Sequence, residues 1–389
     1  MAFPQDEAFR YANQRTVFRT IRHAGSTTRR QLTQQTDLSF QTVSNIVSEL
    51  FDMNLVVSDG LVNQSAGKRA ESIKINPRGL YAVGILLDRT GFELNLIDLE
   101  GNSLAHTAES SSSIHPDTVL RHIATLTQEF LKQADVPLSR FAGLGIASPG
   151  PIDFRYGAIS HPPNFPGWAF VPVQQRLNEL MNCPVTLIKD SHAAALAEVW
   201  ALNAEAPSSL FYLYFSAGIG GALVIDNRIW TGFLGNAGEI GHVKVAQEPA
   251  CDCGRQGCLE SVWSLGRAAS NANLSVEQFA QLLQTKTSPH WDQWKPGLRF
   301  LAQATVDIVN VMEPEVVIIG GPQGEAISGH VIPTLNSALQ QGGFVRHLRP
   351  ISVQNAVVRP AASIGAGLLQ INASLTTSTR SSGQVGLDI

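Results

Sequence analysis

The sequence predicts an α/β protein in which a small, helix-rich amino-terminal domain precedes a larger domain of two lobes. Three observations carry this prediction. From about residue 80 to about residue 370, short apolar runs typical of buried strands alternate with longer stretches typical of helices. Before residue 80, three helical stretches are followed by two short strand signals. Within the larger domain, three cysteines lie close behind one histidine.

The composition is that of a globular protein with enough apolar material for two or three packed domains. Of the 389 residues, 44% are hydrophobic and 15% are charged. The net charge of −4 argues against a protein wholly devoted to nucleic acid, so any DNA contact has to be local. The start of the chain lacks a basic region followed by an apolar core, and no apolar run reaches membrane-spanning length. We therefore expect a cytoplasmic protein without membrane insertion, a compartment that suits four cysteines with no paired framework.

The amino-terminal domain, residues 1–78, has the pattern of a winged helix-turn-helix. An apolar stripe at residues 17, 18 and 21 predicts the first helix, and Thr28 with Gln31 is typical of a capping box that opens the second. Ser39 caps a third helix, whose buried face is predicted to be Val43, Ile46, Val47 and Leu50. Two short strands at residues 55–57 and 72–75, joined by a polar loop, complete the wing.

The opposite face of the third helix carries short, neutral side chains that suit hydrogen bonds to base edges in the major groove. They are Gln41, Thr42, Ser44, Asn45 and Ser48. Six arginines lie between residues 10 and 30, and Lys68 and Arg69 in the hairpin loop are placed to clamp phosphate or enter the minor groove. The alternative is a three-helix cap with a solvated face, but such faces are more often rich in Glu and Lys. The sequence therefore predicts binding to DNA.

In the larger domain, residues 79–372, strands and helices alternate in an order that fits two similar halves facing each other across a cleft. Strands are expected at residues 81–87, 92–98, 103–107, 141–147, 185–188, 210–215, 222–225, 316–319 and 352–358, and a helix at 117–134. Glycine-rich segments that follow strands are the places where ligands bind such sheets, and segments 147–151, 216–221 and 318–322 have this form. The residues after 372 are small and polar, which predicts a disordered tail at 373–389.

Four residues of metal-binding type lie within one short stretch: His242, Cys251, Cys253 and Cys258. Three thiolates and one imidazole are a typical ligand set for a tetrahedral structural zinc ion. Gly254 and Gly257 permit the turns that such a site needs. The alternatives are three cysteines clustered by chance or paired as a disulfide, but Cys251 and Cys253 are too close to pair comfortably and Cys183 is remote. The pattern therefore predicts bound Zn²⁺.

Over about residues 80–370, the order of these motifs resembles the ROK family of sugar kinases and repressors. The resemblance rests on Ser148-Pro149-Gly150-Pro151, Asn164, Gly167-Trp168, Asp190 before an alanine-rich helix, Gly218–Gly221, Glu239-x-Gly241-His242 and the cysteine cluster. It implies an actin-like, ribonuclease-H-like sugar-kinase fold of two lobes, a structural zinc, a sugar in the cleft and a homodimer or homotetramer. With a winged helix-turn-helix in front, the chain resembles the transcriptional repressor branch, which regulates carbohydrate metabolism genes.

The resemblance also implies roles for single residues. Asp190 matches the catalytic base of the kinases, although it can equally cap the helix that follows it. Asn164, Glu239, His242 and Glu260 match sugar contacts, with His242 shared between zinc and sugar. Lys189 stands where the family usually has asparagine. We hypothesise that Lys189 either pairs with Asp190 and fills the pocket or favours an acidic or phosphorylated sugar.

The first phosphate loop departs from the kinase pattern of an acidic residue, glycines and a threonine. The chain reads Leu86-Leu87-Asp88-Arg89-Thr90, which keeps only the threonine. Leu86 removes the acid that helps to hold magnesium, and Asp88 brings a negative charge where phosphate should approach. Ala217 replaces a common hydroxyl in the second loop. We therefore expect no enzyme activity, and a repressor that binds operator DNA under control of a sugar or sugar-phosphate effector. A sugar kinase, or a regulator controlled by a protein partner with a vestigial sugar pocket, is the alternative.

Overall fold

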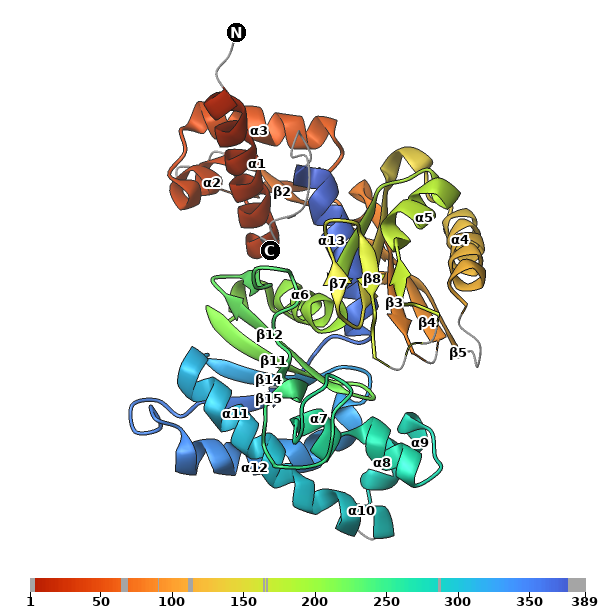
Figure 1. The fold of residues 1–389 in the computed structure, drawn as a ribbon. Coiled ribbons are helices and arrows are strands. Elements are labelled where there is room, and N and C mark those ends of the chain that lie inside the picture. The colour runs from red at the N-terminus through yellow and green to blue at the C-terminus, as the bar shows by residue number, and fades with distance from the viewer. Residues whose placement is uncertain are drawn as a thin grey trace.

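Three parts follow one another along the chain in the computed structural model: a small amino-terminal domain and two lobes (Figure 1). The structure describes residues 4–63, 69–89, 91–110, 115–163, 165, 167–285 and 288–376, with side chains from residue 12 onward. Across these described ranges, no helix combines the length and the apolar character needed to cross a lipid bilayer.

The amino-terminal domain has the three helices and the hairpin that the sequence predicts. Its elements are α1 (Pro4–Ala24), α2 (Arg29–Thr36), α3 (Phe40–Asp52), β1 (Val56–Asn63) and β2 (Arg69–Ile75), the two strands pairing antiparallel. Thr28 and Gln31 form the predicted capping box, and the Ser39 hydroxyl accepts a hydrogen bond from the Thr42 backbone amide. The predicted apolar stripes are buried in one core: Val17, Phe18, Ile21, Val43, Ile46, Val47 and Leu50. The winged helix-turn-helix is thereby confirmed.

The first lobe is built on a five-stranded sheet in the order β10-β6-β3-β4-β5. Its strands are β3 (Tyr81–Asp88), β4 (Gly91–Asp98), β5 (Ser103–Ser110), β6 (Phe141–Ser148) and β10 (Val185–Lys189). The first three form an antiparallel meander, and β6 continues the sheet parallel to β3, followed by β10 parallel to β6. Helices α4 (Pro116–Gln133) and α5 (Val173–Met181) share a core with the face of β3 that carries Val83 and Ile85.

The second lobe repeats this topology in the order β13-β12-β11-β14-β15. Its strands are β11 (Ser209–Phe215), β12 (Ile219–Ile225), β13 (Arg228–Trp230), β14 (Val316–Gly320) and β15 (Ser352–Asn355). A meander again lies on one side of the central strand, and two parallel strands lie on the other. Its helices are α7 (Leu259–Val262), α8 (Leu265–Asn271), α9 (Val276–Leu283), α10 (Pro289–Trp294), α11 (Leu298–Met312) and α12 (Gly324–Gly342). The duplication confirms the predicted two-lobed α/β architecture.

Several elements differ from the sequence-based prediction, among them β13, which was not expected, and β1 and β5, which are longer than expected. A small sheet of β7 (Ile152–Asp153), β8 (Ala158–Ser160) and β9 (Phe170–Val171) was not expected, because strands of two or three residues are too short to show alternation. Strand β15 ends three residues before its predicted end at 358. Helix α13 (Ala361–Thr376) runs past residue 372, since Ala373 is buried and Leu375 packs on the core. Residues 377–389 of the predicted tail lie outside the described part of the chain.

Two helices, α6 (Asp190–Leu202) and α13, connect the lobes and lie side by side between the sheets (Figure 1). Each follows the parallel edge strand of one sheet, β10 or β15. The helices are so close that a Cβ on Gly365 would lie 1.8 Å from the carbonyl oxygen of Ala193. Helix α13 also lies on the first sheet, where a Cβ on Gly84 would lie 1.8 Å from the Ser363 carbonyl oxygen. Glycine at these two positions sets the spacing of the interlobe layer.

The amino-terminal domain docks on the end of α6 through Arg22. Its guanidinium lies 3.6 Å from the centroid of the Trp200 ring and donates a hydrogen bond to the Trp200 carbonyl oxygen. The Asn203 amide donates to the Arg22 carbonyl oxygen at 3.3 Å. Burial lowers the pKa of Arg22 to about 10, and the Glu100 carboxylate opposes that shift. A cavity of about 330 Å³ beside this contact is lined by residues of α1, α6, α13 and the β4–β5 turn.

We expect Arg22→Ala to loosen the docking of the amino-terminal domain, because the cation–π contact and the hydrogen bond to Trp200 are lost. In hydrogen-exchange mass spectrometry, peptides from the ends of α1 and α6 should exchange several-fold faster than in the wild type. Arg30→Ala, at an exposed position of α2, is the matched control and should leave these peptides unchanged. Unaltered exchange in Arg22→Ala would show that other contacts hold the domain in place.

Candidate functional site

The four predicted metal ligands lie together on the second lobe. A ring nitrogen of His242 and the Sγ atoms of Cys251, Cys253 and Cys258 all lie within 4.8 Å of one another. Cys251 Sγ is 3.6 Å from His242 Nδ1, and Cys253 Sγ is 3.6 Å from Cys258 Sγ. Ligands at about 2.3 Å from a tetrahedral ion are separated from each other by about 3.8 Å. The four side chains therefore fit one tetrahedral metal ion.

Tight turns at two glycines bring the sulfur atoms together. Gly254 and Gly257 have φ angles of 84° and 69°, in the left-handed region, as the sequence predicts. The Gly254 amide donates to the Cys251 carbonyl oxygen at 2.9 Å and closes the first turn. A Cβ on Gly257 would lie 1.8 Å from the carbonyl oxygen of Ala246. Residue 257 therefore has to be glycine for the last cysteine to reach the cluster.

A single 3-10 turn, η5 (Ile240–His242), joins the metal ligands to the predicted ligand site. Glu239 immediately precedes the turn and His242 ends it. Gly241 is pressed against the neighbouring chain, since a Cβ there would lie 2.5 Å from the Ile219 carbonyl oxygen and 3.1 Å from Glu260 Oε2. The turn therefore holds the Glu239 carboxylate and the His242 imidazole in a fixed relation to each other.

Asp190 is the first residue of α6, directly after β10. The Ser191 backbone amide donates to Asp190 Oδ1 at 2.7 Å, but the N-cap of α6 is Lys189 and there is no side-chain cap, so the interpretation of Asp190 as the helix cap is wrong. Burial raises the pKa of Asp190 to about 7. The Lys189 ammonium and the Ser191 amide oppose that shift, while the carboxylates of Asp88 and Glu239 add to it. A carboxyl group with this pKa exchanges protons near neutral pH.

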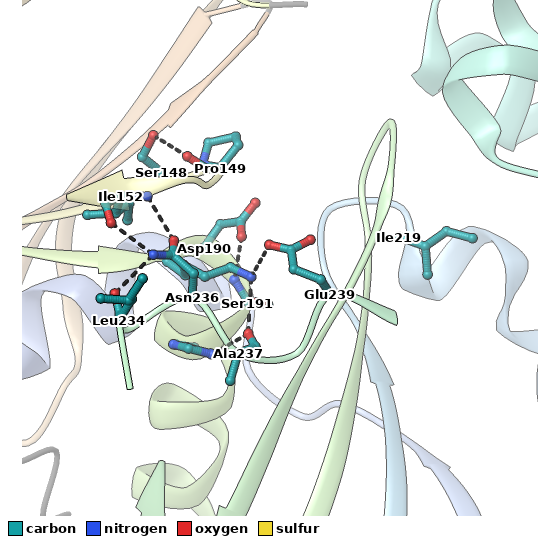
Figure 2. Close-up of polar contacts among 12 residues, drawn as sticks. Ser148, Pro149, Ile152, Asp190, Ser191, Ile219, Leu234, Asn236, Ala237 and Glu239 are labelled. Carbon is teal, nitrogen blue, oxygen red and sulfur yellow. Dashed lines mark hydrogen bonds and ion pairs between the residues drawn. The ribbon is translucent and has the colours of Figure 1, made fainter. Parts of the chain in front are cut away.

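Lys189 is buried and is paired with Glu239. Its side chain is 3% exposed, and its ammonium lies 2.5 Å from Glu239 Oε1 and donates to the Ala237 carbonyl oxygen at 3.1 Å. The Glu239 side chain is 44% exposed. The hydrogen-bonded partner of Lys189 is thus Glu239, not Asp190 as one hypothesis from the sequence states. We call Lys189, Asp190 and Glu239 the interlobe site, because they bring the end of β10 and the start of α6 together with the second lobe (Figure 2).

The segment before Glu239 holds functional contacts that sequence reasoning missed. Asn236 Oδ1 accepts a hydrogen bond from the Ile152 amide, and Asn236 Nδ2 donates to the Ile152 carbonyl oxygen, both at 2.8 Å (Figure 2). The Ala237 carbonyl oxygen accepts from Lys189 and, at 3.0 Å, from His192 Nε2. Asn236 thereby ties the second lobe to β7 over 84 positions of sequence, a separation that leaves no local signal.

Glu260 fills the glycine turn between β11 and β12. The Ile219 amide donates to Glu260 Oε2 at 2.9 Å, and a Cβ on Gly218 would lie 2.3 Å from the same oxygen. Segment 216–221 therefore turns the chain from β11 into the antiparallel strand β12. Asn164, the remaining predicted sugar contact, lies outside the described residues.

The sequence was compared with models of known protein families. A family model described as the ROK family matches residues 82–369. The chain belongs to the ROK family.

Similar proteins within the ROK family include repressors and kinases. The xylose repressor of Caldicellulosiruptor bescii is 26% identical over 380 residues, which cover 90% of this chain and 93% of that protein. The glucokinase of Thermotoga maritima is 30% identical over 264 residues, which cover 62% of this chain and 82% of that protein. A solved ROK family transcriptional regulator, described as a homologue of the E. coli MLC protein, superposes with a TM-score of 0.78 at 22% identity, covering 95% of this chain and 97% of the other. This last likeness supports the fold.

In this ROK protein, the turn at the end of β3, which the sequence predicts to match the first phosphate loop of the kinases, carries an acidic side chain. The Leu86 side chain is buried, and the Arg89 amide donates to Asp88 Oδ1 at 2.6 Å. Burial raises the pKa of the Asp88 carboxyl. Thr90 lies outside the described residues, and the carbonyl oxygen of Ala217 accepts from the Gly266 amide at 2.8 Å.

Helix α3 presents the predicted DNA-contacting face to solvent. Its residues are exposed or partly exposed: Gln41, Thr42, Ser44, Asn45 and Ser48. The Gln41 side chain donates to Asn45 Oδ1 at 2.9 Å, which aligns the two amides on one face. Phe40, which sequence reasoning missed, is 57% exposed at the first turn of this helix. Arg69 is exposed at the start of β2, and Lys68 lies outside the described residues.

We expect the raised pKa of Asp190 to appear in the pH dependence of stability. A carboxyl group whose pKa is higher in the folded state binds more protons when the protein is folded. Its contribution to the free energy of unfolding is therefore fully present below about pH 4 and is lost as the pH rises through about 7. Asp190→Asn should therefore gain stability relative to the wild type over this range, by on the order of 1 to 3 kcal/mol.

Chemical denaturation at three pH values across this range measures the difference. Asp226→Asn, at an exposed turn position with a positive φ that asparagine tolerates, is the matched control and should show no such trend. A stability difference for Asp190→Asn that stays constant with pH would mean that Asp190 is ionised in the folded protein at all of these pH values.

Proposed function

We propose that this ROK protein is a transcriptional repressor that binds operator DNA near carbohydrate metabolism genes and responds to a sugar ligand held between its lobes. The observation that carries the proposal is the winged helix-turn-helix, with the exposed polar face of α3, in front of the ROK fold (Figure 1). The match to a xylose repressor over 90% of the chain supports it, because a match of that extent takes in much of the amino-terminal domain.

On the DNA side, α3 enters the major groove and its neutral side chains contact base edges. These side chains are Gln41, Thr42, Ser44, Asn45 and Ser48. Lys68 and Arg69 in the wing contact phosphate and contribute affinity more than sequence choice. In a homodimer or homotetramer, two α3 helices about one DNA turn apart read a palindromic operator.

We expect Gln41→Ala and Asn45→Ala each to weaken operator binding by about tenfold or more, since each substitution removes a side-chain amide that can bond to a base edge. The wild-type protein selects its operator from a random DNA library, and fluorescence anisotropy then measures the variants on that sequence. Gln341→Ala, on the exposed face of α12, is the matched control and should bind like the wild type. Equal affinity of the wild type for the selected and a scrambled sequence would refute specific DNA binding.

On the ligand side, the proposed contacts are Asn164, Lys189, Asp190, Glu239, His242 and Glu260. Carboxylates and an imidazole accept or donate hydrogen bonds to sugar hydroxyls. Because Asp190 starts α6 and Glu239 belongs to the second lobe, a bound sugar contacts both sides of the interlobe layer. The sugar releases DNA only if it has a higher affinity for the domain arrangement that cannot bind DNA than for the arrangement that can.

The metal at His242, Cys251, Cys253 and Cys258 is proposed to be zinc, because a ligand set of three sulfurs and one nitrogen favours Zn²⁺. Zinc would be held through His242 Nδ1, which lies toward Cys251 Sγ, and this leaves Nε2 for a second contact. The ion supplies no reaction in this role; it fixes η5 and thereby Glu239.

We expect the purified protein to contain about one zinc ion per chain and Cys253→Ser to lose most of it, with a lower melting temperature. Cys183→Ser is the control and should keep the metal. It is the same kind of substitution, at a cysteine that lies outside the cluster. Elemental analysis and thermal melts provide the two readouts. Full zinc occupancy in Cys253→Ser would contradict the four-ligand site.

A sugar kinase is the second candidate, since Asp190 has the position and a pKa suited to a general base and some relatives are glucokinases. The buried Leu86 and the acidic Asp88 disfavour it, because they leave no acid for magnesium and place a carboxylate at the phosphate. We expect no sugar-dependent release of ADP from ATP over a panel of hexoses and pentoses. Turnover above background would make the kinase the better assignment. If a protein partner releases the operator and no sugar has an effect, the better assignment is a regulator controlled by a protein partner, with a vestigial sugar pocket.

A further inference from the structure

The buried pair of Lys189 and Glu239 determines the charge that a ligand meets at the interlobe site. The lysine side chain is 3% exposed, and its ammonium is engaged by Glu239 Oε1 and by the Ala237 carbonyl oxygen. The Glu239 side chain is 44% exposed. A ligand that approaches from solvent therefore reaches the carboxylate before it reaches the ammonium.

Most of the other charged groups around this pair are acidic, and the Arg89 guanidinium acts on the Asp88 carboxylate. Asp190 follows Lys189 directly, and the carboxylates of Asp88 and Glu239 both act electrostatically on Asp190. Glu260 adds a further carboxylate beside η5. It lies against Gly241, which is two residues beyond Glu239. Since the positive charge of Lys189 is balanced by Glu239 and that of Arg89 acts on Asp88, the carboxylates of Asp190 and Glu260 are left in excess. A phosphate or carboxylate group on a ligand would be repelled here, and more strongly at partly buried positions than in water.

We propose that the Lys189–Glu239 pair makes the interlobe site selective for an uncharged sugar and excludes sugar phosphates and sugar acids. The inference rests on the proposed sugar-responsive function and narrows its ligand class. Lys189 is a positioning residue: it holds Glu239 Oε1, so that Oε2 accepts a hydrogen bond from a sugar hydroxyl. The hypothesis that Lys189 recruits an acidic or phosphorylated sugar is thereby replaced.

Isothermal titration calorimetry on the full-length, metal-containing protein tests the inference. The probes are xylose, glucose and N-acetylglucosamine, each compared with a phosphorylated counterpart, together with glucuronate. We expect at least one neutral sugar to bind and its phosphorylated or acidic counterpart to bind roughly tenfold more weakly or worse.

Two substitutions separate the positioning role from a merely structural one. Glu239→Gln leaves the Lys189 charge without its partner, so the affinity ratio of phosphorylated to neutral sugar should rise by about tenfold or more. Lys189→Met keeps the length of the side chain and removes the charge, so neutral-sugar affinity should fall while anions stay excluded. Glu129→Gln and Lys132→Met, at exposed positions of α4, are the matched controls and should leave both affinities unchanged. Circular dichroism checks that each variant is folded; if Glu239→Gln does not fold, the wild-type ratio and Lys189→Met decide.

The outcomes separate the inference from the proposed function. Tighter binding of a phosphorylated than of a neutral sugar by the wild type overturns the inference alone, as does an unchanged ratio in folded Glu239→Gln. Absence of binding by every sugar, with operator binding intact, overturns the inference together with control by sugars. If the protein shows the expected preference for neutral sugars but binds no operator, the inference stands and the proposed function as a repressor is overturned.

Discussion

The close packing of α6 against α13 is the constraint on which the rest of the structure depends. The carbonyl oxygen of Ala193 lies where a Cβ on Gly365 would have to be, so the two helices are held at backbone contact. Helix α6 begins at Asp190 in the interlobe site, and its last turn carries Trp200, on which Arg22 stacks. Thirteen helical residues span about 20 Å. The proposed ligand site and the winged helix-turn-helix domain are thus attached near the two ends of one helix, which gives a displacement at either end a direct mechanical route to the other.

The cluster of His242 and the three cysteines lies on the other side of the interlobe site, because η5 joins His242 to Glu239. Glu239 and His242 flank η5, and the turn is packed against β12 at Gly241. The three sulfur ligands lie on a loop with two left-handed glycines and its own backbone hydrogen bonds, and an ion bound by all four side chains would tie this loop to η5. A metal bound there does not need to touch the ligand to affect it, since it sets the position of the carboxylate that Lys189 holds from the other side.

Structural features that depend on neighbouring residues, such as helix starts and buried faces, were predictable from the sequence. Contacts between distant segments were not. The start of α3 follows from Ser39, and the buried face of α3 follows from its helical period. The cysteine spacing likewise indicated one metal site. The partner of Lys189 lies 50 positions away, and Arg22 meets Trp200 across 178 positions, so neither pairing leaves a local pattern. Tertiary packing decided both contacts, as it also carried α13 beyond the expected start of the tail.

The charge balance around Asp190 links two departures from the kinase pattern that look independent in the sequence. Asp88 adds a carboxylate at the turn where phosphate would bind, and this carboxylate disfavours ionisation of Asp190. Lys189 acts in the opposite direction on Asp190 while it neutralises Glu239. Without the lysine, several carboxylates would share one partly buried region, which is costly unless they are paired or protonated. The acidic turn and the buried lysine therefore belong to one region, in which Lys189 supplies a counter-charge for the neighbouring carboxylates.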